Sequence, residues 1–216
     1  MKTYLIALTT FIFSFSAFAQ NTSKVLINTS LGDIVVELYN ETPQHRDNFI
    51  KLAKSGYLNN TLFHRVIPKF MIQGGDPDSK NALPSVQLGN GGPGYTIPAE
   101  FNSRFFHQKG ALAAARAPDG VNPKKESSGS QFYIVEGEIL NLERLSLYEN
   151  KLGVTFSPEQ KQAYTTVGGT PHLDGSYTVF GQVVKGLDVI SKIAQVKRDQ
   201  KNRPLEDIIM KVKIIK

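Results

Sequence analysis

Residues 63–76 read Phe63-His64-Arg65-Val66-Ile67-Pro68-Lys69-Phe70-Met71-Ile72-Gln73-Gly74-Gly75-Asp76. Apolar and polar residues alternate on both sides of Pro68, so the pattern predicts a strand, a break and a second extended segment. Side chains two apart on a strand share a face, which places Met71 and Gln73 on one face of the second segment. Phe70 and Ile72 are expected on the opposite face.

Arg65 is the residue of this stretch that most needs an explanation. A guanidinium is always charged, and holding it among apolar side chains is costly unless it has a partner or a task. One such task is to hydrogen-bond a substrate whose remaining surface is apolar. An ordinary structural salt bridge is the alternative.

Two further motifs follow in chain order. They read Ser128-Gly129-Ser130-Gln131-Phe132-Tyr133-Ile134, and Leu173-Asp174-Gly175 with Thr178-Val179-Phe180-Gly181 after it. The three motifs together resemble the signature of the cyclophilins, the peptidyl-prolyl cis-trans isomerases. The resemblance covers roughly Lys24 to Lys216, apart from an extra segment near residues 138–168. It implies a closed eight-stranded antiparallel barrel capped by two helices.

The residue pattern itself indicates a mainly β chain. Two apolar runs at 25–29 and 34–38 flank a turn and predict a hairpin, and further strands are predicted at 63–67, 70–73, 110–115, 131–135, 178–183 and 208–215. Thr42-Pro43 predicts a helix start with Thr42 as the N-cap, and Gly56 predicts its end. A second helix is predicted across Leu187–Ala194. Many short strands with two helices favour a closed barrel over a βαβ sheet.

The extra segment has a helical pattern of its own. Apolar residues recur with rough helical spacing from Leu140 to Leu152, and Ser157-Pro158-Glu159-Gln160 is a second helix-start signal. These features predict an inserted helical pair at 138–168, between two barrel elements. Its role is either to dock a partner or, as we favour, to elaborate local packing.

The N-terminus predicts export. Lys2 precedes a mostly apolar run from Tyr4 to Phe18, and Ala17-Phe18-Ala19 supplies small residues before Gln20. This is the layout of a cleaved signal peptide over residues 1–19, which leaves one domain at 20–216 with no stable membrane insertion. An uncleaved anchor is the alternative, but the run is shorter than the roughly 20 apolar residues that a membrane span needs. We expect the periplasm, with full secretion as the alternative.

Isomerisation of an X–Pro bond needs few chemical groups. Rotation about the bond must overcome a barrier of about 18–20 kcal/mol, because amide resonance is lost. A dry pocket for the proline ring and a hydrogen-bond donor that favours the twisted amide are sufficient, so neither a metal nor a cofactor is expected. A guanidinium supplies such donors and keeps its proton.

The resemblance assigns roles to particular residues. It implies that Arg65 is catalytic and that Gln73 orients it together with the substrate. The implied substrate-binding residues are Phe70, Met71, Tyr133, Leu173 and Tyr177 around the proline, with Ala115, Arg116, Ala117, Gln131 and His172 beside it. The implied contact of residues 115–117 is made by their backbone. Each residue taken alone also has an ordinary structural explanation, such as core or barrel packing.

Four of these residues depart from the most familiar form of the family. Tyr133 replaces a phenylalanine, Arg116 an asparagine, His172 a tryptophan and Tyr177 a histidine. The replaced tryptophan contributes to cyclosporin binding in some members, so the resemblance does not predict that this chain binds the drug. The ring of Tyr177 can still cover a proline, so we expect activity to be retained.

Other chemistries fit the sequence poorly. The 25 Lys and Arg residues exceed the 19 Asp and Glu residues only mildly, and the basic cluster at 192–203 contains no aromatic residue, unlike a nucleic-acid-binding surface. The four histidines show no metal-ligand spacing, and the chain has no cysteine that could act as a nucleophile or form a disulfide. The sequence therefore predicts a monomeric prolyl isomerase that assists folding of exported, proline-containing polypeptides. A non-catalytic proline-peptide-binding or chaperone module is the alternative.

Overall fold

Residues 63–76 contain the predicted hairpin. Strands β3 (Phe63–Ile67) and β4 (Met71–Gly74) pair in antiparallel fashion, and the backbone N–H of Phe70 donates to the carbonyl of Ile67 (3.1 Å) across the turn. Pro68 and Lys69 are the central turn residues, and Lys69 has a φ of 61°. Because this turn interrupts the strand alternation, Phe70 packs with Met71 and not on the face of Ile72. The prediction that Phe70 shares a face with Ile72 was therefore wrong.

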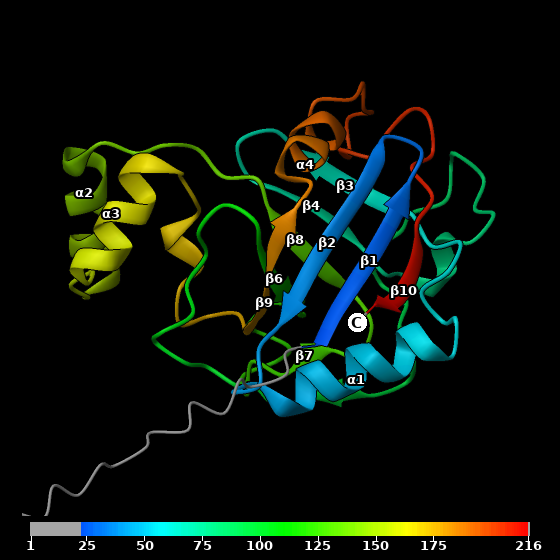
Figure 1. Cartoon of the computed structure of the whole chain (residues 1–216), viewed down its shortest axis with the longest axis horizontal. Coiled ribbons are helices and arrows are strands. Elements are labelled where there is room, and N and C mark those ends of the chain that lie inside the picture. The colour runs from blue at the N-terminus through cyan, green and yellow to red at the C-terminus, as the bar shows by residue number, and fades with distance from the viewer. Residues whose placement is uncertain (1–22, 216) are drawn as a thin grey trace, which may run out of the picture.

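The sheet to which this hairpin belongs curls into a barrel-like shape (Figure 1). The computed structural model describes residues 23–215, so the predicted signal peptide lies outside the described residues. Eight antiparallel strands follow the order β10-β1-β2-β9-β6-β8-β4-β3, and β5 pairs separately with β7. The bounds not yet given are β1 Ser23–Thr29, β2 Gly32–Leu38, β5 Thr96–Ile97, β6 Ala111–Ala114, β7 Ser127–Ser128, β8 Phe132–Val135, β9 Val179–Lys185 and β10 Lys211–Ile215.

The two edges of the sheet meet just before β3 and β10. The N–H of Phe63 donates to the carbonyl of Ile208 (2.9 Å), and the N–H of Met210 donates to the carbonyl of Thr61 (2.9 Å). A bridge between Leu62 and Ile209 lies between these bonds. The closure takes up residues 208–210, which is why β10 starts three residues later than the predicted strand at 208–215.

Alternation along the strands divides the buried residues into two clusters. One cluster fills the concave side of the sheet with residues such as Ile72, Phe132 and Ile134. The other lies on the opposite face and includes Met71 and Tyr133, which alternate with the first set along β4 and β8. The barrel therefore has a conventional interior and a second, smaller apolar cluster on its outer surface.

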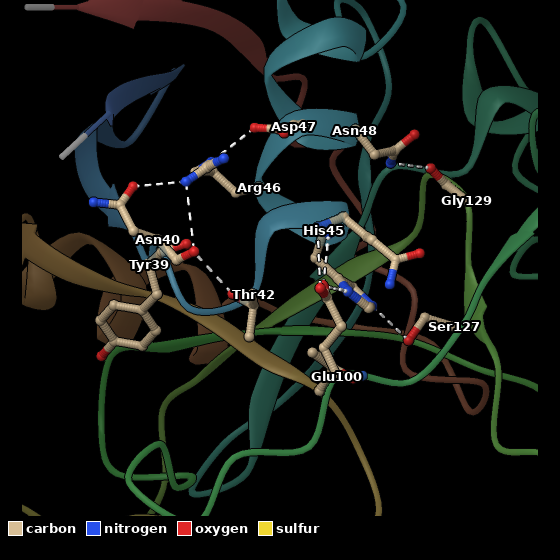
Figure 2. Close-up of polar contacts among 12 residues, drawn as sticks. Tyr39, Asn40, Thr42, His45, Arg46, Asp47, Asn48, Glu100, Ser127 and Gly129 are labelled. Carbon is tan, nitrogen blue, oxygen red and sulfur yellow. Dashed lines mark hydrogen bonds and ion pairs between the residues drawn. The ribbon is translucent and has the colours of Figure 1, made fainter. Parts of the chain in front are cut away.

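Helices α1 (Pro43–Lys54) and α4 (Leu187–Ala194) cover opposite ends of the curled sheet (Figure 1). Both were predicted, and α4 has the predicted bounds. Thr42 occupies the N-cap position of α1, but its hydroxyl makes no capping hydrogen bond and donates to the carbonyl of Tyr39 (3.5 Å). Glu100 performs this function from a distant loop, because it accepts the backbone N–H groups of Gln44 (3.1 Å) and His45 (2.9 Å), as Figure 2 shows for His45.

The predicted inserted helices are also present. Helix α2 (Leu142–Leu152) ends at Gly153 in the left-handed conformation, and α3 (Pro158–Thr166) starts with a capping box in which Ser157 and Gln160 exchange hydrogen bonds. The pair follows β8 and precedes β9 in the chain, and it lies to one side of the barrel (Figure 1). It has its own small apolar cluster around Tyr164. The short 3-10 helices η1 (Pro77–Ser79) and η2 (Pro171–Leu173) follow β4 and α3. Within residues 23–215, no helix is long and apolar enough to cross a membrane.

We expect the fold to lose stability as the pH falls, because two buried histidines resist protonation. Burial lowers the pKa of His45 and His64 below the ordinary value of 6.5. The unfolded chain therefore binds more protons than the folded chain below about pH 6.5, and the unfolding free energy falls with decreasing pH. Urea titrations from about pH 7 to about pH 5 measure this slope. A His45→Gln variant should have a shallower slope, and a parent slope of zero would contradict the prediction.

Candidate active site

Register across four strands brings the predicted site residues into one row. Arg65 on β3 pairs with Gln73 on β4, Gln73 pairs with Tyr133 on β8, and Tyr133 pairs with Ala113 on β6. Partners in register place their side chains on the same face of a sheet. The row therefore runs across the outer apolar cluster and not through the barrel interior.

A hollow of about 130 Å³ lies over this row and is called the central hollow. Nine of the twelve predicted site residues line it, and they are Arg65, Phe70, Met71, Gln73, Ala115, Arg116, Tyr133, Leu173 and Tyr177. The tyrosine rings of Tyr133 and Tyr177 meet edge to face, with centroids 5.8 Å apart. The lining is mostly apolar and aromatic, with one guanidinium and one amide at the edge where β3 and β4 pair.

A chain of amides orients the guanidinium of Arg65. Its Nη1 donates to Oε1 of Gln73 (3.2 Å), and Nε2 of Gln73 donates to Oε1 of Gln131 (3.2 Å). Nε2 of Gln131 in turn donates to the carbonyl of Gly91 (2.8 Å). Each amide has its oxygen and nitrogen ends assigned by its neighbours, so Gln73 can only present its oxygen to Arg65.

Within residues 23–215, no carboxylate pairs with Arg65. The described residues therefore do not support the alternative in which Arg65 forms only a structural salt bridge. Burial lowers the pKa of the Arg65 guanidinium, and a guanidinium so shifted still keeps its proton at neutral pH. Its carbon lies 5.9 Å from the centroid of the Phe70 ring. A half-buried cation beside an apolar hollow thus has most of its five N–H donors left for a ligand.

A buried hydrogen-bond network connects Tyr133 to the inserted helices. The hydroxyl of Tyr133 lies 2.9 Å from Nε2 of His107, and Nδ1 of His107 lies 2.8 Å from Oδ1 of Asp174. The other carboxylate oxygen, Oδ2, accepts the hydroxyl of Tyr164 on α3 (2.6 Å). A carboxylate can only accept, so the proton of the neutral imidazole is on Nδ1 and Tyr133 donates to Nε2. Burial raises the pKa of Tyr133 well above its ordinary value, which keeps that hydroxyl protonated.

An aromatic stack makes a second connection between the insertion and the hollow. His172 stacks on Phe70 (ring centroids 5.6 Å apart) and on Tyr148 of α2 (5.8 Å). His172 was expected beside the substrate, but it does not line the central hollow and instead lies behind Phe70. The insertion is therefore connected to Phe70 through His172, and to Tyr133 through Asp174 and His107.

The segment 115–117 is less open to a ligand than expected. The N–H and carbonyl of Ala115 bond to Gln131 (3.0 Å) and Ser128 (2.7 Å), and the carbonyl of Ala117 accepts Nη1 of Arg116 (3.0 Å). The Arg116 side chain also lies 4.6 Å above the Tyr177 ring and binds the carbonyl of Ser176 (2.7 Å). Arg116 thus holds Tyr177 in place. Ala117 and Gln131 line a neighbouring groove of about 820 Å³ that shares Gln73 with the central hollow.

Sequence reasoning did not predict the contacts that support the site from behind, although Asp174 stands in the third motif. His107 lies 67 residues before Asp174, and no local spacing connects it with Asp174 or Tyr164. The only signal was the tyrosine at position 133, whose buried hydroxyl requires a partner. Among the described residues, no three His, Cys, Asp or Glu side chains gather as a metal site would require.

Comparison with known proteins gives a consistent result. Residues 24–214 match the family model described as cyclophilin type peptidyl-prolyl cis-trans isomerase/CLD. A candidate peptidyl-prolyl cis-trans isomerase of Staphylococcus saprophyticus is 37% identical, over 87% of this chain and 89% of the relative. A candidate bifunctional phosphatase/peptidyl-prolyl cis-trans isomerase of Streptococcus pyogenes is 36% identical, and the match spans only 37% of that longer protein.

A solved structure also resembles the fold. It is a cyclophilin type peptidyl-prolyl cis-trans isomerase of Cryptosporidium parvum, crystallised in the presence of the dipeptide Ala-Pro. The match has a TM-score of 0.66 and 27% sequence identity, and it covers 89% of this chain and 99% of the other.

Proposed function

We propose that this chain, which belongs to the cyclophilin-type peptidyl-prolyl cis-trans isomerase family, accelerates X–Pro bond rotation in exported, flexible polypeptides. One observation carries the proposal for the site. The half-buried Arg65 lies at the edge of an apolar hollow, bonded to Gln73 and paired with no carboxylate among the described residues.

The chemistry follows from what each group can do. The apolar lining accepts the pyrrolidine ring and excludes water, which strengthens hydrogen bonds made inside. As the amide twists, resonance is lost and the prolyl nitrogen becomes a hydrogen-bond acceptor, and a donor of Arg65 then bonds the twisted state better than the planar one. Gln73 fixes the direction of the guanidinium beforehand. A barrier lowered by about 7 kcal/mol corresponds to a roughly 10⁵-fold acceleration.

A proline-containing ligand is supported by the comparison with the Cryptosporidium parvum structure, which was determined in the presence of Ala-Pro. In the proposed complex of this chain, the proline ring occupies the central hollow between Phe70, Met71, Tyr133, Leu173 and Tyr177. The preceding residue lies toward Arg65 and Gln73.

A protease-coupled assay tests the activity. Residues 20–216 are added to an X–Pro tetrapeptide that the protease cleaves only in the trans form, and the rate of the slow phase is measured. We expect a slow phase that quickens in proportion to protein concentration. Well-folded protein that binds the tetrapeptide without quickening this phase would favour the non-catalytic peptide-binding module.

Export is a separate part of the proposal and rests on the N-terminal sequence. The full chain is expressed in a Gram-negative host, and the recovered protein is sequenced from its N-terminus. We expect the product in the periplasmic fraction, beginning at Gln20. A chain that keeps Met1 and sediments with membranes would instead indicate an uncleaved anchor, and an intact chain in the cytoplasm would exclude export.

A further inference from the structure

A second hollow lies between the inserted helices and the barrel, and is called the insertion groove. It has a volume of about 370 Å³, within the range of ordinary ligand sites. Its apolar walls include Phe101, Phe105 and Phe106 from the loop before β6, Leu152 at the end of α2, and Val154 and Phe156 from the segment that joins α2 to α3.

The groove marks the boundary between two packed clusters. Phe105, Tyr177 and Val179 belong to the outer cluster of the barrel, whereas Phe106, Leu152 and Phe156 belong to the cluster of the insertion. The two clusters meet without filling the space between them. Phe101 and Val154 remain 44% and 46% exposed at its walls. Single exposed apolar residues are ordinary, but several that line one hollow form a binding surface.

Contacts on both sides hold the walls of the groove in place. Phe105 stacks on Tyr39 with ring centroids 3.9 Å apart, and Phe106 and Phe156 each meet the ring of Tyr164 at 5.6 Å. The N–H of Phe156 donates to Oε1 of Glu149 (2.8 Å), which closes the loop between α2 and α3. A wall fixed in this way is preorganised, so a ligand does not have to order it on binding.

Tyr177 lines both the insertion groove and the central hollow, so the two hollows are neighbours. An extended chain advances by about 3.3–3.6 Å per residue, so a peptide with its proline in the central hollow reaches the groove within a few residues. We consider a side chain as the occupant, because the groove is a single hollow of about 370 Å³. A folded partner would instead need a surface that buries about 800 Å² on each side.

We propose that the insertion groove binds an aromatic or large aliphatic side chain of the same polypeptide whose proline occupies the central hollow. The proposal rests on the proposed function for the identity of the neighbouring site. On this proposal the insertion contributes to substrate specificity. It favours unfolded segments that carry an apolar residue at a fixed distance from proline.

Labelled peptides test the groove. Each peptide has one proline, one phenylalanine at a different position on either side of it, and serine elsewhere, and fluorescence anisotropy gives its Kd. We expect one spacing to bind about 10-fold more tightly than the others, since burying an aromatic side chain is worth about that much or more. Val154→Glu, which places a carboxylate in the groove, should abolish this preference. The matched control Leu147→Glu, on the same insertion and 64% exposed, should retain it.

Two results would overturn the proposal. One is a parent protein whose Kd does not depend on spacing, and the other is a Val154→Glu variant that keeps the preference. Circular dichroism checks each variant, and Phe101→Ser replaces Val154→Glu if that variant does not fold. Isomerisation of the same peptides separates the two proposals. Spacing-dependent binding without acceleration would contradict the proposed isomerase activity and support the groove. Acceleration with a Kd that does not depend on spacing would support the isomerase activity and contradict the groove.

Discussion

Arg65→Ala lowers kcat/KM for X–Pro isomerisation by at least about 100-fold, which is the usual loss when one donor that stabilises a transition state is removed. The guanidinium bonds Gln73 and lies beside Phe70, so its removal takes away the cation that lines the hollow together with Gln73. The protease-coupled assay on residues 20–216 measures the change. Arg65→Lys should recover only part of the loss, because an ammonium keeps the charge without the planar set of donors.

The control for this variant is Arg144→Ala. Arg144 lies on α2 and pairs with Glu138 at an exposed position, so its removal should leave kcat/KM near that of the parent. Matched circular dichroism spectra establish that all variants are folded. Equal turnover in Arg65→Ala and the parent would rule out the proposed role of the guanidinium.

Asp174→Ala lowers the unfolding free energy by about 3 kcal/mol, because it leaves buried donors without an acceptor. Asp174 accepts the backbone N–H (2.9 Å) and Nδ1 of His107 through one oxygen, and the hydroxyl of Tyr164 through the other. The substitution should also lower isomerase activity, because His107 without its acceptor no longer fixes the hydroxyl of Tyr133 in the central hollow. Urea unfolding followed by circular dichroism measures stability, and the assay above measures activity.

Two variants calibrate this result. Tyr164→Phe removes a single hydrogen bond to Asp174 and should cost about 1 kcal/mol. Asp188→Ala removes an exposed carboxylate that pairs with Lys192 and should leave stability close to that of the parent. If Asp174→Ala were as stable as Asp188→Ala, the buried network would not contribute to holding the insertion on the barrel.

The sequence predicted those parts of the fold that depend on neighbouring residues. The β3–β4 hairpin follows from local alternation around Pro68, and α3 follows from the Ser157 capping signal. Phe70 was placed on the wrong face because a positive φ at Lys69 cannot be read from alternation. The acceptor that caps α1 was missed because Glu100 lies far along the chain from Thr42.

The same distinction explains what was predicted at the site. The motifs named the residues that line the central hollow, and sheet register brought Arg65, Gln73 and Tyr133 together. The positions of His172 behind Phe70 and of Asp174 behind His107 depend on the insertion, which the three motifs do not describe. Residues that support a site through tertiary contacts leave no spacing in the sequence from which to infer them.

The network from Tyr164 to Tyr133 bears on how the insertion can be removed or transplanted. Excising residues 138–168 would take away Tyr164 and leave His107 and Asp174 buried with fewer partners. A phenylalanine at position 133 would need no acceptor, whereas the tyrosine hydroxyl depends on His107 being held by Asp174. To move the insertion into another barrel, the two helices must therefore be transferred together with His107, Tyr133 and Asp174. A chimaera that receives only the helices would lack the buried partners that connect them to the site.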